Sequence, residues 1–143
     1  NRSQTVYLPI TVTFLKYKNS EFLFDLNEYN PKKLGKGSSA TTYKIAVEGY
    51  YFTCKYYKCT KKKDIKEIFK EIEILKQIKS KRFPLFCTHL QKKENIYIFY
   101  DYIDGIDLFE TIDSQYNKIN NINTQISIMY EITKALYTLF NHN

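Results

Sequence analysis

The chain has 143 residues, of which 43% are hydrophobic and 17% aromatic, so it can bury a core and is too apolar for a wholly disordered protein. Its formal charge is +7, but only Arg2 and Arg82 among the 22 basic residues are arginine, the type that proteins prefer for contacts with phosphates and bases. We therefore interpret the charge as a solvated lysine surface and expect no nucleic-acid partner.

The three cysteines, Cys54, Cys59 and Cys87, contain no C-x-x-C pair, so the sequence indicates neither a disulfide framework nor a zinc site. A reducing compartment, the cytoplasm or the nucleus, is the expected location. The longest apolar run, residues 6–15, is interrupted by threonines and is too short to cross a bilayer, so we expect no membrane partner. Because the chain begins at Asn1 and not at methionine, we expect it to be part of a longer protein.

Residues 1–28 are predicted to be an N-terminal extension that packs on a sheet. Within it, Thr5–Lys16 and Glu21–Leu26 have the pattern of extended segments joined by a turn. A strand is predicted to follow over Tyr29–Gly37, with Pro31 tolerated near its beginning.

A glycine-containing loop, LGKGSSA, occupies residues 34–40. Glycine can adopt positive φ and leaves backbone amides uncovered, and amides strung along a turn suit phosphate oxygens. A dinucleotide-binding glycine loop must open a helix, whereas residues 42–47 alternate with the period of a strand and Glu48-Gly49 marks a turn into the next strand. The loop therefore begins a hairpin, which argues against a Rossmann domain.

Lys55 lies in the middle of the second hairpin strand, among aromatic residues and Cys54, where a charged side chain normally needs an anion to offset its desolvation. The clearest helix is predicted over Lys61–Lys79, because apolar residues recur there at three- and four-residue steps. Glu71 falls inside the resulting apolar arc and Glu73 outside it, which makes Glu71 the expected partner of Lys55. Glu67 lies close to the same arc, so spacing alone leaves it open.

The rest of the chain predicts two more strands, a hinge and two helices. The two strands are Phe83–Leu90 and Asn95–Tyr100, and a polar turn at Gln91–Glu94 joins them. A glycine-containing break follows at Asp101–Ile106, and then a short helix at Asp107–Ser114. An asparagine-rich linker at Tyr116–Asn123 leads to a last helix, whose apolar face runs from Ile126 to Phe140.

This order of motifs resembles the eukaryotic protein kinase domain over about residues 29–143. The resemblance implies an α+β fold, with a kinase-like N-lobe at residues 29–101 that contains a five-stranded antiparallel sheet and one long helix. Residues 102–143 would be the hinge and two helices of an incomplete C-lobe. The implied activity is transfer of the γ-phosphate of ATP to a serine or threonine hydroxyl of a protein substrate.

The resemblance also implies roles for individual residues. The kinase V-A-I-K segment is matched by Thr53-Cys54-Lys55, and the helix segment that pairs with its lysine resembles Glu71-Ile72-Glu73-Ile74-Leu75. The implied catalytic residues are therefore Lys55 and Glu71. Lys55 would hold the α- and β-phosphates of ATP. The implied ATP-binding residues are Leu34, Gly35, Lys36, Gly37, Ser38, Ser39, Ala40, Thr42, Thr53, Lys55, Tyr100, Asp101, Ile103 and Asp107.

Four of these residues belong to the strand and hinge that would hold adenine. Tyr100 corresponds to the gatekeeper at the back of the adenine pocket, and Asp101 and Ile103 would present backbone groups to the base. Asp107 would reach the ribose hydroxyls, although its place at the start of a helix suits an N-cap equally well.

Departures from the family pattern support an alternative, a pseudokinase that acts as a binding scaffold. Thr42 and Thr53 stand where kinases usually place a small apolar pair above the adenine ring, Ser39 replaces a common aromatic lid, and the catalytic half of the domain is missing from the sequence. A nucleic-acid binder that uses the lysine surface is a third hypothesis.

The chain ends at Asn143, just before the H-R-D catalytic loop and the later D-F-G motif would be expected. The catalytic base and the metal ligands would therefore lie outside this sequence. We expect no metal site within the chain, Mg²⁺ only together with those residues, and no activity from this chain alone.

Overall fold

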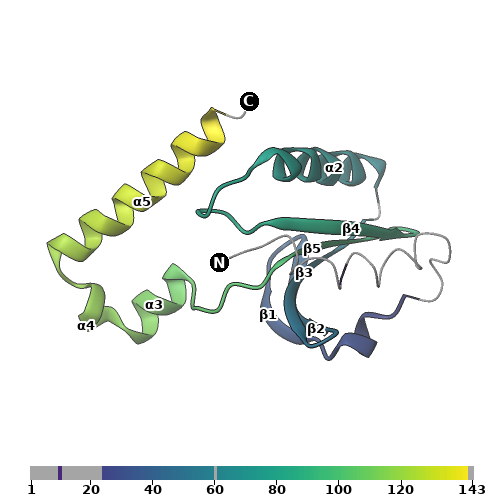
Figure 1. Cartoon of the computed structure of the whole chain (residues 1–143), viewed down its shortest axis with the longest axis horizontal. Helices are drawn as coiled ribbons and strands as arrows, with labels where there is room; N and C mark the ends of the chain where they lie inside the picture. Colours follow the sequence, from purple (N-terminus) through teal and green to yellow (C-terminus); the bar gives the residue numbers. More distant parts are fainter. Residues whose placement is uncertain (1–9, 11–23, 60, 142–143) are drawn as a thin grey trace.

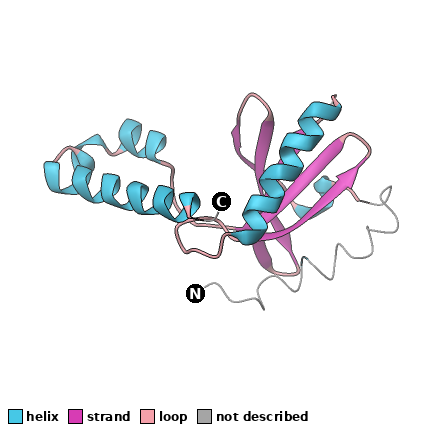
Figure 2. Ribbon diagram, turned by 90° about the horizontal axis from the view of Figure 1, so that it is seen from above, coloured by secondary structure: helices cyan, strands magenta, loops and turns pink. Residues whose placement is uncertain are grey.

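The computed structural model describes residue 10, residues 24–59 and residues 61–141. A sheet covered by one helix forms one part of the molecule, and a group of helices reached through residues 102–107 forms the other (Figures 1 and 2). The elements are the 3-10 helix η3 (Leu26–Tyr29), β1 (Lys32–Lys36), β2 (Ala40–Val47), β3 (Tyr50–Lys58), α2 (Lys62–Gln77), β4 (Phe86–Lys92), β5 (Asn95–Asp101), α3 (Leu108–Ser114), α4 (Tyr116–Ile119) and α5 (Ile122–Phe140).

The sheet has the strand order β1-β2-β3-β5-β4, and every neighbouring pair is antiparallel. The predicted α+β class with a five-stranded antiparallel sheet is thus confirmed. β3 is the central strand, so Lys55 has Thr42 of β2 on one side and Ile98 of β5 on the other. The predicted turn at Glu48-Gly49 is also confirmed, since both residues have the positive φ, 51° and 82°, that a two-residue hairpin turn requires.

Two predicted strands begin later than expected. Tyr29 belongs to η3, whose N-cap Asp25 accepts a hydrogen bond from the amide of Asn27 at 2.9 Å, so β1 starts at Lys32. β4 starts at Phe86 and not at Phe83, because Pro84 has no amide to donate to a neighbouring strand. β4 also runs on to Lys92, which shortens the predicted polar turn.

The predicted linker at residues 116–123 is wrong, because it contains the short helix α4 and the beginning of α5. Asn121 is the N-cap of α5 and accepts a hydrogen bond from the amide of Thr124 at 2.9 Å. Asparagine is as favourable at a helix N-cap as in a loop, so its abundance did not mark a linker here. Three helices, not two, follow the hinge in residues 108–141.

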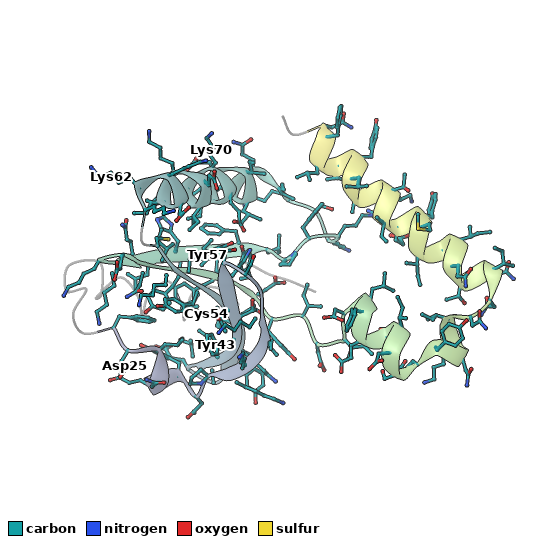
Figure 3. The ribbon with its side chains drawn as sticks, turned by 180° about the vertical axis from the view of Figure 1, so that it is seen from behind. Asp25, Tyr43, Cys54, Tyr57, Lys62 and Lys70 are labelled. Atoms are coloured by element: carbon teal, nitrogen blue, oxygen red, sulfur yellow. The ribbon has the colours of Figure 1, made fainter. Side chains whose placement is uncertain are left out.

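The two faces of the sheet bury separate clusters. One face packs against α2 through residues that include Tyr57, Ile72 and Ile98, while the other buries Cys54 and Phe99 together with Phe24 and Ile10. Figure 3 shows Tyr57 on the α2 side of the strands and Cys54 with Tyr43 on the far side. The predicted extended segments at residues 5–16 and 21–26 lie mostly outside the described residues.

An ion pair connects the sheet part to the helical part. Arg82, in the connection between α2 and β4, lies 3.3 Å through Nε from Oε2 of Glu131 on α5. None of the helices in the described part of the chain is long and apolar enough to span a membrane.

Candidate functional site

Lys55 of β3 and Glu71 of α2 form an ion pair with 3.0 Å between Nζ and Oε1. α2 directs Glu71 toward the sheet because Ile68 and Ile72, on the same arc, are buried against it. Glu73 points elsewhere and pairs with Lys76 on the exposed side of the helix. Spacing had left Glu67 open as a partner of Lys55, and the structure selects Glu71. The side chains of the pair are 31% and 35% exposed, so a ligand can reach them.

Tyr57 also contacts Glu71, and the sequence alone did not predict it as a residue of the site. Its hydroxyl donates a hydrogen bond to Oε2 of Glu71 over 2.9 Å, and the Nζ of Lys55 lies 5.0 Å from the centre of its ring. The available signal was its position two residues after Lys55, since residues i and i+2 of a strand share a face.

The surroundings keep Lys55 charged. Burial on its own would lower the pKa of Lys55, but hydrogen bonds to Tyr57 and Glu71 outweigh it and raise that pKa above its ordinary value. The pKa of Tyr57 is raised mainly by burial, to which the Glu71 carboxylate adds while Lys55 opposes. The cluster therefore consists of one cation, one anion and a neutral phenol at neutral pH.

A cavity of about 410 Å³ opens beside Lys55, within the size range of small-ligand sites. Seven predicted ATP-binding residues line it together with three that were not predicted: Leu34, Thr42, Thr53, Lys55, Tyr100, Asp101 and Ile103, and in addition Leu75, Pro84 and Tyr102. Leu75 lies one turn after Glu71 on the same apolar arc, a signal that could have identified it.

Tyr100 is a buried residue of β5 that lines this cavity. Burial, followed by the nearby negative charge of Glu71, raises its pKa. Its hydroxyl is therefore neutral and lies near the Lys55–Glu71 pair.

A second cavity, of about 530 Å³, lies between the glycine loop and α2. It is lined by loop residues 36–41, by residues 56–59, which include Tyr57, and by Asp64, Glu67, Ile68 and Glu71 of α2. Lys55 lines the first cavity and Glu71 the second, so their ion pair lies where the two cavities meet. The predicted loop residues Lys36, Gly37, Ser38, Ser39 and Ala40 thus all face the Glu71 side.

The glycine loop closes on itself, because the amide of Gly37 donates to the carbonyl of Ala40 over 2.8 Å. This bond leaves the amides at the loop tip, those of Ser38 and Ser39, as the candidates for binding phosphate. Neither Gly35 nor Gly37 adopts the positive φ that glycine permits, whereas Gly49 does. Neither position therefore requires glycine for its backbone conformation, and a Cβ on Gly35 would meet no atom within 4 Å.

Two predicted residues, Gly35 and Asp107, line neither cavity. Asp107 is the N-cap of α3, where its Oδ1 accepts a hydrogen bond from the amide of Glu110 over 2.7 Å. Of its two possible roles, the structure shows the cap, and contact with a ribose stays a prediction.

Asp101 is fixed at the end of β5 by Leu85. Its amide donates to the Leu85 carbonyl over 3.1 Å, and its buried Oδ1 accepts from the Leu85 amide over 2.7 Å. The amide and one carboxylate oxygen of Asp101 are thus both bound to Leu85, which fixes the start of the hinge. Among the described residues, no group of three or more His, Cys, Asp or Glu side chains could hold a metal ion.

Comparison with known proteins gives a family match and similar folds. A family model described as the protein kinase domain matches residues 29–143. The crystal structure of the PknI kinase domain from Mycobacterium tuberculosis aligns with a TM-score of 0.65 at 14% identity, over 78% of this chain and 47% of that one. A cysteine-to-alanine mutant of the same domain gives 0.63 at 15% identity, over 76% and 46%.

The chain therefore spans about half the length of these structures, and at such identity the likeness concerns the fold. No curated protein matches the chain.

Proposed function

Since the chain belongs to the protein kinase domain family, we propose that it is the ATP-binding part of a kinase that transfers the γ-phosphate of ATP to a serine or threonine hydroxyl of a protein. The observation that carries this proposal is the Lys55–Glu71 ion pair, 3.0 Å long, beside a cavity lined by seven of the residues assigned to ATP.

Lys55 suits a phosphate-binding role by charge and by position. A lysine ammonium has three N–H donors, and the contacts with Glu71 and Tyr57 do not use all of them, so at least one remains for a phosphate oxygen. Phosphoryl transfer depends chiefly on positioning and on stabilising charge on the phosphoryl oxygens. Because Glu71 is held on α2, it fixes the direction in which the ammonium points.

The cavity beside Lys55 suits a flat base. Leu34 of β1, Thr42 of β2 and Thr53 of β3 would lie on one side of adenine, and the hinge residues Asp101 and Ile103 would offer backbone groups at its edge. The phosphates would extend toward Lys55 and the loop tip. In protein kinases, binding of Mg²⁺ and proton transfer from the substrate hydroxyl depend on the H-R-D loop and the D-F-G motif, and neither motif occurs in the 143 residues.

The direct test is Lys55→Met in the complete protein, with phosphate transfer from ATP to a generic protein substrate as the measurement. We expect a loss of at least about 100-fold in kcat, the scale reported for losing one preorganised electrostatic contact. Lys66→Met is a matched control, because Lys66 lies on the exposed side of α2. Equal turnover in Lys55→Met and wild type would remove Lys55 from its assigned role.

A scaffold function without turnover is the second candidate, and the two threonines in the cavity favour it. Thr42 and Thr53 bring hydroxyls to a surface that would face an apolar ring, where unpaired polar groups weaken binding. Magnesium and ATP distinguish the candidates, because a ligand that binds only the folded state raises the melting temperature. No shift at millimolar ATP would favour the scaffold.

A further inference from the structure

Glu71 is held by two donors that come from the same face of the same strand. Lys55 Nζ approaches Oε1 at 3.0 Å, and the hydroxyl of Tyr57 approaches Oε2 at 2.9 Å. Each carboxylate oxygen therefore has its own partner on β3. Two contacts fix the rotation of the carboxylate, whereas a single ammonium would leave it free to turn.

The two donors to Glu71, the ammonium of Lys55 and the hydroxyl of Tyr57, differ in exposure and in charge. The Lys55 side chain is about one-third exposed and carries a charge, so phosphate anions in the adjacent cavity would share the ammonium with Glu71 and weaken its hold on the carboxylate. Tyr57 is only 6% exposed, and it packs with Ile68 and Ile72 of α2 in a buried cluster. Its hydroxyl is neutral and its ring is held by packing, so an anion beside Lys55 would attract the hydroxyl less than it attracts the ammonium, even though Tyr57 also lines the second cavity.

We propose that Tyr57 is a positioning residue that holds Glu71, and with it α2, against β3 independently of Lys55. The hydrogen bond keeps the carboxylate in place while Lys55 serves the phosphates. The catalytic consequence rests on the proposed kinase function, whereas the restraint on α2 does not.

The restraint is tested by hydrogen exchange of the α2 amides in the complete protein without nucleotide. Tyr57→Phe removes only the hydroxyl, and because a hydrogen bond to a charged group is among the stronger ones, we expect exchange around Ile68–Ile72 to become about tenfold faster. In a Glu71→Ala background the same substitution should add nothing, because its acceptor is already gone.

Tyr56→Phe is the matched control. The Tyr56 hydroxyl also makes one side-chain hydrogen bond, to Oδ1 of Asn95 over 2.7 Å, but it lies on the opposite face of β3 from Glu71. We expect α2 exchange in this variant to equal that of wild type. If Tyr57→Phe behaves like Tyr56→Phe, the inference is overturned.

Kinetics test the positioning role. In Tyr57→Phe we expect kcat to fall about tenfold while KM for ATP changes by less than about twofold, because a misplaced Glu71 affects the transition state more than ground-state binding. Faster α2 exchange with unchanged kcat would overturn the positioning role. A wild-type protein with no phosphoryl transfer at all would instead overturn the proposed function, and the exchange experiment would still decide whether Tyr57 restrains α2.

Discussion

Lys92 of β4 donates a hydrogen bond from Nζ to the carbonyl oxygen of Phe24, 68 residues earlier in the chain, over 3.0 Å. The kinase family match begins only at residue 29, so this bond joins the kinase sheet to a segment outside the match. The ring of Phe24 is 2% exposed and packs edge-on against Tyr97 with 4.8 Å between ring centres. The segment around Phe24 therefore contributes to the core on the sheet face opposite α2.

The first prediction follows from this burial. Phe24→Ala should lower the free energy of unfolding by about 3–5 kcal/mol, as for other large-to-small changes in a core, measured by urea denaturation. Phe109→Ala removes the same atoms from a side chain that is 82% exposed, and its effect should stay within about 0.5 kcal/mol. Similar losses in both variants would show that Phe24 does not serve as part of the core.

The second prediction concerns the carboxylate that fixes the hinge. Asp101→Ala leaves the Leu85 amide without its 2.7 Å acceptor, so we expect a loss of about 2 kcal/mol in unfolding free energy. Asp101→Asn keeps an oxygen acceptor and should lose less. The control is Asp104→Ala, at an exposed position three residues later, and an equal loss in that variant would contradict the assignment.

The sequence predicted the elements on which the site depends, because each had a strong local signal. The apolar arc identified Glu71 over Glu73, and Glu48-Gly49 identified the hairpin that carries Lys55. Strand boundaries and the helix α4 were less accessible, because they depend on local features that periodicity does not show, such as the Asp25 cap of η3 and the Asn121 cap of α5.

Other parts of the site depend on side-chain placement, which periodicity does not give. Tyr57 shares a strand face with Lys55, but spacing alone does not say whether its hydroxyl reaches Glu71 or the solvent. Asp107 has both a capping and a ligand-binding interpretation, and the structure shows the capping bond alone. Such residues require the three-dimensional arrangement to be assigned.

The third prediction concerns alkaline pH. Burial in the first place, together with nearby groups such as Tyr56 and Asp25, raises the pKa of Tyr97 to about 12, whereas a phenol in an unfolded chain titrates near 10. Between these values the unfolded chain loses a proton that the folded chain keeps, so stability is full below about pH 10 and falls as the pH rises toward 12.

Tyr97→Phe should therefore make the loss of unfolding free energy between about pH 10 and pH 12 shallower, as measured by denaturation at each pH. Tyr56, Tyr57 and Tyr100 act in the same direction, so the difference between wild type and variant isolates Tyr97. The control is Tyr116→Phe, at an exposed position. A slope as steep in Tyr97→Phe as in wild type would refute the prediction.

The last prediction addresses whether the two threonines limit nucleotide binding. Thr42→Val and Thr53→Ala replace hydroxyls in the cavity by apolar groups of equal or smaller size, and a purely apolar surface suits the faces of adenine better. We expect the double variant of the complete protein to bind ATP about tenfold more tightly, measured by calorimetry. Thr88→Val, on β4 and outside both cavities, should leave the affinity unchanged. Weaker binding in the double variant would mean that the hydroxyls contribute to ATP recognition, and the scaffold hypothesis would lose its main support.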